Sequence, residues 1–188
     1  GNITFMKEVV LSKINLIYGS VDLPKGFEIN RNKIKTDIIT SYLDEKRINN
    51  NSQAYSYKDY KVPFSKPLQW LQDYLRDNIK TDYGFNLIPK NIFGNVMHPK
   101  EQSFLRSQIE PVDLINSPDY TLIYGVDIEK NCCECIIEYD DNRRKNRTWN
   151  LPIENNEFIM FPSTQKYMFT ENKSKKLNTI LTINYEFI

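Results

Sequence analysis

Few residues in this 188-residue chain could bind a transition metal. It contains one histidine, His98, which stands directly before Pro99. A facial site for Fe(II) takes two neutral imidazoles and one carboxylate, so a chain with a single histidine cannot supply that set. We predict that His98 is an ordinary loop residue, with a relocated metal ligand as the alternative.

The three cysteines of the chain lie together as Cys132, Cys133 and Cys135. On a β-strand, Cys133 and Cys135 would share a face and Cys132 would not. A structural zinc site needs four convergent ligands, which this spacing does not provide. We predict buried thiols, and the odd count argues for a reducing compartment rather than a disulfide framework.

Acidic and basic side chains form two weaker candidates for a binding site. Glu110 and Asp113, in the stretch IEPVDL, could hold a hard cation through oxygen atoms. Because they flank Pro111, we predict that they are solvated or cap a turn. The basic residues 143–147 could contact phosphate or an acidic partner, but they lie in a stretch typical of a solvated hairpin tip.

The elements that would position these residues follow from periodicity. Apolar residues recur at helical spacing near Asn32–Glu45 and near Lys66–Ile79, where Ser65 is the expected N-cap and Trp70 belongs to the predicted apolar stripe. From Asn91 onward, short stretches with a period of two follow one another with turns between, among them Phe104–Ile109 and residues 119–127. In the latter, Tyr120, Leu122, Tyr124 and Val126 share a face that we expect to pack in the core, with a pocket lining as the alternative. Many short strands preceded by helices predict a mainly β (α+β) fold. Residues 48–63 are predicted to form a surface loop.

Composition limits the partners. Lys plus Arg number 25 and Asp plus Glu number 24, so the net charge gives no case for nucleic acid or an anionic membrane. No apolar stretch has the length of a bilayer span, and we expect a soluble, cytoplasmic protein (host cytoplasm if viral). Met6 is an alternative native start. We expect a small molecule or a protein as partner, and a homo-oligomer stays open.

The half of the chain from Asn91 to Ile188 resembles the phage and bacterial 2-oxoglutarate/Fe(II) dioxygenases, whose fold is a double-stranded β-helix, or jelly roll. The residues that carry the resemblance are the runs NVMHPKEQ, SPDYTLIYGVD, YDDNRRKNRTWNLPIENNEFIMFPS and NTILTIN. The resemblance implies one domain over residues 1–188, with a supporting part (1–90) and a jelly-roll core (91–188). It also implies where the metal and cosubstrate positions fall.

Those positions are degenerate in this chain. By the family's spacing, Arg106 and Gln108 stand where the first ligand pair belongs, Tyr167 stands at the second histidine position, and Asn178 replaces the arginine that grips 2-oxoglutarate. Arginine stays protonated and cannot ligate a metal, and loss of the family arginine removes a bidentate contact to a carboxylate. If the jelly roll forms, these four residues are expected to converge inside it.

The leading hypothesis is therefore a non-catalytic relative of these oxygenases, phage-related and acting as a binding or interaction module, with no cofactor expected. One alternative is an active oxygenase with non-standard ligands around Tyr167, Glu110 or His98, which would need Fe(II) and 2-oxoglutarate. The other alternative is a virion or assembly component built on the same fold. Fold by itself does not choose among them.

Overall fold

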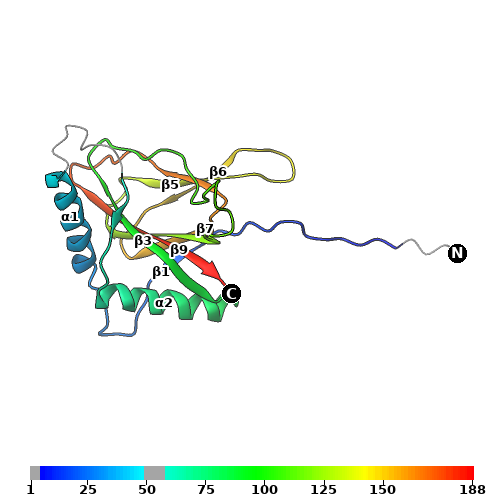
Figure 1. The fold of residues 1–188 in the computed structure, drawn as a ribbon, viewed down its shortest axis with the longest axis horizontal. Helices are drawn as coiled ribbons and strands as arrows, with labels where there is room; N and C mark the ends of the chain where they lie inside the picture. Colours follow the sequence, from blue (N-terminus) through cyan, green and yellow to red (C-terminus); the bar gives the residue numbers. More distant parts are fainter. Residues whose placement is uncertain (1–4, 49–57) are drawn as a thin grey trace.

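The structure is a computed structural model that describes residues 5–48 and 58–188. Two sheets face each other, and two helices cover the outer face of the larger sheet (Figure 1). The elements in chain order are β1 (Ile17–Ser20), α1 (Arg31–Ile48), β2 (Tyr60–Lys61), α2 (Lys66–Tyr83), β3 (Leu87–Met97), β4 (Tyr120–Asp127), β5 (Glu134–Tyr139), β6 (Arg147–Pro152), β7 (Glu157–Pro162), β8 (Lys166–Phe169) and β9 (Asn178–Phe187).

The larger sheet has the strand order β1-β7-β4-β9-β3-β2, and the smaller sheet has the order β6-β5-β8. Neighbouring strands in both sheets run antiparallel. The hairpin predicted around residues 140–147 joins β5 to β6. This arrangement confirms the predicted mainly β jelly roll with supporting helices, whereas the single domain and its division at residue 90 stay predictions. Among the described residues, neither helix combines the length and apolarity needed to cross a membrane.

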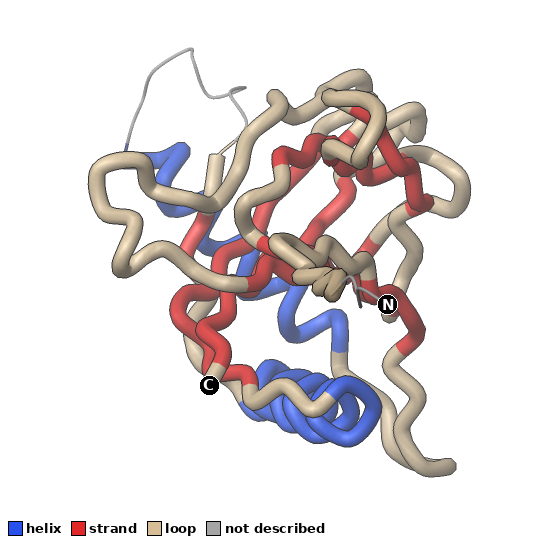
Figure 2. Tube along the Cα trace, turned by 90° about the vertical axis from the view of Figure 1, so that its right-hand side faces the viewer, coloured by secondary structure: helices blue, strands red, loops and turns tan. Residues whose placement is uncertain are grey.

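Two apolar cores follow from the alternation of side chains along the strands. One face of β4, with Leu122, Tyr124 and Val126, packs toward the helices, as predicted from its period of two. The opposite face, with Ile123, belongs to the core between the two sheets. Figure 2 shows α2 lying beneath the strands on the side of the molecule away from the smaller sheet.

The helices keep their predicted positions but not every predicted contact. The side chain of Ser65 accepts a hydrogen bond from the Leu68 amide and caps α2, as predicted. The buried stripe of α2 includes Leu68, whereas Trp70 is 47% exposed, so its place in the predicted stripe is wrong. Tryptophan is large and often only partly covered, which explains why spacing alone misplaces it.

One predicted strand is not formed. The run Phe104–Ile109 contributes only an isolated bridge between Arg106 and Tyr167, whose backbones exchange two hydrogen bonds. Next to this bridge, the Ser103 amide donates to the Phe169 carbonyl. The segment therefore continues the smaller sheet beyond β8 by these few contacts, and they suffice to place Arg106 beside Tyr167. Part of the predicted surface loop, residues 49–57, lies outside the described residues.

Candidate functional site

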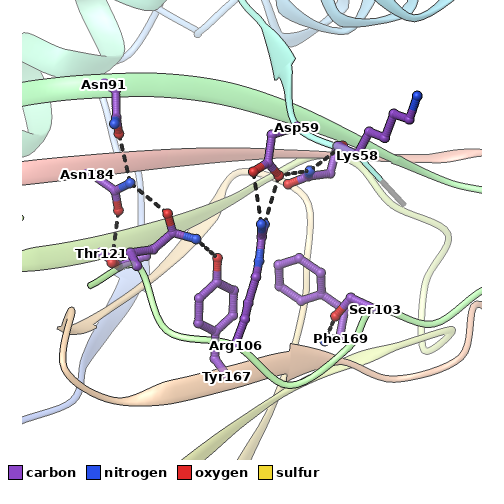
Figure 3. Close-up of polar contacts among 11 residues, drawn as sticks. Lys58, Asp59, Asn91, Ser103, Arg106, Thr121, Tyr167, Phe169 and Asn184 are labelled. Carbon is purple, nitrogen blue, oxygen red and sulfur yellow. Dashed lines mark hydrogen bonds and ion pairs between the residues drawn. The ribbon is translucent and has the colours of Figure 1, made fainter. Parts of the chain in front are cut away.

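The site that the sequence points to lies between the two sheets, where the Arg106 bridge meets β8. The Gln108 side-chain amide donates a 2.7 Å hydrogen bond to the Tyr167 hydroxyl. The Asn184 amide, from β9, donates in turn to Gln108 Oε1 at 3.0 Å and to Asn91 Oδ1 at 2.7 Å. Figure 3 shows this chain of side chains running from Tyr167 toward β3.

The chain of hydrogen bonds continues into β4 and the turn after β7. Thr121 Oγ1 donates to Asn184 Oδ1 at 2.9 Å and lies 2.8 Å from Ser163 Oγ. Thr121, Ser163 and Asn184 are all at most 1% exposed. Buried polar groups are stable when they satisfy one another, and these side chains do so across several strands and turns.

Arg106 is held by a carboxylate from the other side of the site. Its two terminal nitrogens donate to the two oxygens of Asp59 at 2.9 and 2.8 Å, a bidentate ion pair. Asn95 on β3 also donates to Asp59 Oδ1, at 2.8 Å. The guanidinium lies 5.7–5.8 Å from the ring centroids of Phe93, Phe104 and Tyr167, a distance at which a cation is attracted to an aromatic face.

Tyr167 is a buried phenol, only 1% exposed. Burial raises its pKa to about 12, although the nearby Arg106 charge and the Gln108 hydrogen bond act in the opposite direction. A phenolate is the form that would ligate iron, and the neutral phenol is strongly favoured near neutral pH. The Tyr167 hydroxyl is therefore neutral near neutral pH and accepts the Gln108 hydrogen bond.

Of the four residues expected to converge, Arg106, Gln108 and Tyr167 are in contact and Asn178 is not among them. Asn178 is the first residue of β9, where it donates to Cys132 Sγ at 2.8 Å and accepts from the Glu129 amide at 3.1 Å. Its place in the cluster is taken by Asn184, six residues further along the same strand. Since both side chains lie on the same face by the period of two, the sequence carries the signal for Asn184.

Asp59 has no counterpart among the residues predicted from sequence, because it belongs to the polar stretch predicted as a surface loop. Its importance comes from the pairing of β2 with β3, which brings it next to Asn95 and Arg106. Such a long-range contact has no local sequence signal. Asp59 and Arg106 are 47 positions apart in the chain, so no local sequence pattern predicts their contact.

The other candidates have structural partners. His98 Nε2 lies 2.8 Å from the Tyr42 hydroxyl, and its Nδ1 lies 3.6 Å from Glu101 Oε1. Asp113 accepts two hydrogen bonds from Asn116 within an exposed turn, and the Glu110 amide donates to Ser117 Oγ. His98, Glu110 and Asp113 lie outside the helices and strands, and the roles predicted for them stay predictions.

The three cysteines are free and buried, as predicted, but Cys132 packs in the same core as Cys133 and Cys135. The prediction that it faces the other side is wrong because β5 begins only at Glu134, so strand alternation does not apply at Cys132. Burial raises the pKa of the Cys133 and Cys135 thiols well above the usual range. The described residues contain no group of three or more His, Cys, Asp and Glu side chains that could hold a metal ion.

An apolar pocket of about 250 Å³ is lined by two residues that neighbour Tyr167. Phe161 lines this pocket and also packs on Tyr167, with ring centroids 5.2 Å apart. Ile137, the cross-strand partner of Tyr167, lines it as well. The full lining is Ile14, Asn15, Leu16, Tyr18, Ile137, Tyr139, Trp149 and Phe161. We refer to it as the β1–β6 pocket.

The fold matches solved structures, while no family model and no curated protein matches the sequence. A prolyl hydroxylase from Trichoplax adhaerens, solved with a hypoxia-inducible-factor peptide, superposes with a TM-score of 0.58 at 9% identity, over 91% of this chain and 83% of that chain. A viral collagen prolyl hydroxylase from Paramecium Bursaria Chlorella virus-1, solved with 2OG, gives 0.56 at 10% identity, over 90% and 94%.

A third match is an oxidoreductase of the 2OG-Fe(II) oxygenase family from Burkholderia pseudomallei, with a TM-score of 0.50 at 8% identity. The alignment covers 70% of this chain and 62% of that chain, so this chain spans less than two thirds of that enzyme. Together these structures define the class: the chain has the double-stranded β-helix fold of the 2-oxoglutarate/Fe(II) oxygenases. The resemblance predicted from the sequence is confirmed at the level of the fold.

The expectation that no cofactor is involved is contradicted by these matches. One matched enzyme belongs by name to the 2OG-Fe(II) oxygenases and another was solved with 2OG bound, so the fold points to Fe(II) and 2-oxoglutarate. The expectation is wrong because it rests on ligand residues alone and gives no weight to the fold itself.

The residues of this site nevertheless do not fit Fe(II) in the facial mode. Arg106, Gln108 and Tyr167 supply no imidazole and no carboxylate, and their polar groups are bonded to neighbouring side chains. Two buried oxygens nearby, Asn95 Oδ1 and Thr182 Oγ1, have no hydrogen-bond partner among the described residues. An amide oxygen and a hydroxyl do not replace the missing imidazoles, so these residues do not support a catalytic step through iron.

Proposed function

We propose that this chain is a non-catalytic protein of the 2-oxoglutarate/Fe(II) oxygenase fold that works as a binding module. One observation carries the proposal: the side chains that the sequence resemblance aligns with the metal ligands are bonded to one another and to Asp59. Oxidation in this class needs open coordination sites on iron. A network of satisfied hydrogen bonds gives rigidity and shape instead.

The β1–β6 pocket supplies the binding surface in this proposal. At about 250 Å³ it lies just below the range of about 300–1,000 Å³ usual for small-molecule sites. Its lining is mainly aliphatic and aromatic, which suits the apolar side chains of a polypeptide. The Trichoplax hydroxylase holds a peptide on the same fold, and this supports a protein segment as ligand.

Binding of the class's cofactors without turnover is compatible with this proposal. A phage-related origin is part of it, since the chain is rich in Asn, Lys, Ile and Tyr, as expected from an AT-rich viral or bacterial genome. The oxygenase alternative would need a new ligand set. The Tyr167 hydroxyl is already bonded to Gln108 and the His98 ring lies against the Tyr42 hydroxyl, which argues against these two of the three residues considered for it.

The test is an aerobic assay of 2-oxoglutarate decarboxylation with Fe(II) and ascorbate, in which succinate is measured by proton NMR. We expect no succinate above the level without protein, while a prolyl hydroxylase assayed in parallel gives turnover. Iron-dependent formation of succinate that persists in the purified chain and disappears with a chelator would overturn the proposal.

A further inference from the structure

The N-terminal arm, residues 5–14, leaves the body of the molecule as an extended segment without helix or strand (Figure 1). Its large apolar side chains are exposed to solvent: Phe5 84%, Met6 87%, Val9 71%, Val10 74%, Leu11 94% and Ile14 40%. Six apolar side chains within ten residues form a concentrated apolar surface. Surfaces of this kind mark contacts with another protein.

The arm starts at the β1–β6 pocket. Ile14 and Leu16 line the pocket, and β1 follows at Ile17. The facing walls carry Trp149, 53% exposed, and Tyr18, 63% exposed. An apolar pocket with half-exposed aromatic walls therefore lies directly beside an exposed apolar segment.

Two strand edges border the same pocket. β1 is the last strand of the larger sheet and β6 is the last strand of the smaller one, so each has an edge without a partner in the described chain. Tyr18 belongs to β1 and Trp149 to β6. Open edges accept an additional extended segment through backbone hydrogen bonds.

We propose that the N-terminal arm of a second copy of this chain docks across the β1–β6 pocket, and that the two copies exchange arms in a closed two-fold dimer. This inference rests on the proposed function, for which it names the partner. Each arm places apolar side chains in the pocket of the other copy and runs along an open edge. Reciprocal exchange buries both arms and both pockets in one self-complementary interface. Such an interface has the two-fold symmetry that is usual in homodimers.

The arm does not turn back into its own pocket. Residues 5–16 form no turn, helix or strand, and the chain runs outward there (Figure 1). The residues that line the pocket, Ile14 and Leu16, therefore continue directly from the exposed apolar residues of the arm. A second copy offers the same pocket without requiring a reversal.

The experiment is sedimentation velocity on three chains: wild type, a chain that lacks residues 1–11, and Leu11→Asp. We expect wild type to sediment as a dimer at micromolar concentrations and both altered chains as monomers. Ile115→Asp is the matched control, because Ile115 is 95% exposed and lies outside the arm, and it should remain dimeric. A monomeric wild type, or a dimer that survives truncation of the arm, would overturn the inference.

Tryptophan fluorescence tests whether the arm docks at the β1–β6 pocket. Trp70→Phe leaves Trp149 as the one tryptophan, since the sequence contains two. In the truncated chain with this substitution, adding a peptide of residues 5–14 should shift Trp149 emission to the blue, and an unchanged spectrum at saturating peptide contradicts docking at this pocket. Neither result depends on succinate formation, so failure of the dimer and failure of the non-catalytic proposal are separable.

Discussion

Gln108 connects the two ends of the polar network, because its amide nitrogen binds Tyr167 and its amide oxygen binds Asn184. Truncating it would leave a buried hydroxyl and a buried amide with one partner fewer each. The cost of leaving such groups unsatisfied exceeds the net gain of an ordinary hydrogen bond. This residue therefore reports how far the network stabilises the fold.

We predict that Gln108→Ala lowers the free energy of unfolding by about 1–3 kcal/mol, measured by urea denaturation at pH 7. Gln102→Ala is the matched control, since Gln102 is exposed and close in sequence, and its effect should stay within about 0.5 kcal/mol. Equal effects of the two substitutions would show that the network contributes no stability of its own.

Tyr167 gives the network a signature in alkaline solution. Its folded pKa of about 12 lies above the ordinary value of 10, so the folded state holds the phenolic proton more tightly than the unfolded state does. The stabilisation from this group is fully present below pH 10 and is lost as the pH rises from 10 through 12. The buried Tyr60, whose pKa is also about 12, contributes to the same loss.

We predict that Tyr167→Phe makes the fall in stability between pH 10 and 12 less steep. The shift of two pKa units corresponds to about 2–3 kcal/mol of unfolding free energy contributed by Tyr167. The measurement is urea denaturation of both chains at pH 8, 10 and 11. An unchanged slope in the variant would mean that Tyr167 is accessible to hydroxide in the folded state.

At the scale of elements, Gly125 decides how closely the turn before β7 approaches β4. A Cβ atom at this position would lie 1.9 Å from the Glu154 carbonyl oxygen, which is backbone and cannot rotate away. The Gly125 carbonyl also accepts a hydrogen bond from the Asn156 amide at 2.9 Å. The close approach therefore depends on the absence of a side chain.

Gly125→Ala is expected to destabilise the fold by about 1–3 kcal/mol, as overpacking of a core does. Gly19→Ala, in β1, is the matched control, because its added Cβ meets only the Phe158 ring at an ordinary distance of 3.5 Å. Thermal unfolding followed by circular dichroism compares the two. A Gly125 variant as stable as the Gly19 variant would place the turn differently from the structure.

The elements themselves are largely predictable from sequence. The period of two from Asn91 onward, the Ser65 cap and the hairpin before Arg147 are local signals, and most of the elements that they predict are present. The short strand β2 lies in the stretch predicted as a loop. Phe104–Ile109 is wrongly predicted as a strand. Its alternating pattern suits a strand, but only Arg106 pairs with a neighbouring strand residue, Tyr167. The chain needs only the contacts of Ser103 and Arg106 to close this part of the smaller sheet.

The site is only partly predictable. Arg106, Gln108 and Tyr167 can be placed by the spacing of a family and Asn184 by the face of its strand, whereas Asp59 joins the site through a tertiary contact. Asn178 is misplaced by sequence because a β-strand repeats the same facing every second residue, and position along the strand then decides which residue reaches the site. The alternating pattern predicts which face of the sheet a side chain lies on, but not where along the strand the site is.

At the scale of the whole molecule, a fold of iron-dependent oxygenases surrounds a site with no imidazole pair. Sequence identity to the matched structures is 8–10%, so the shared feature is architecture. The fold brings three of the predicted positions together, and they carry a cation, an amide and a phenol. The fold is shared with the oxygenases, and a shared fold does not by itself fix the chemistry of its centre.

The central claim is that Tyr167, which the sequence resemblance aligns with a histidine ligand, is a neutral phenol bonded to Gln108. The most direct measurement is visible absorption after Fe(II) is added under nitrogen and then oxidised, because a tyrosinate bound to ferric iron produces an intense charge-transfer band. We predict no such band in wild type and a spectrum that matches Tyr167→Phe. A band in wild type that is absent from Tyr167→Phe would contradict the account.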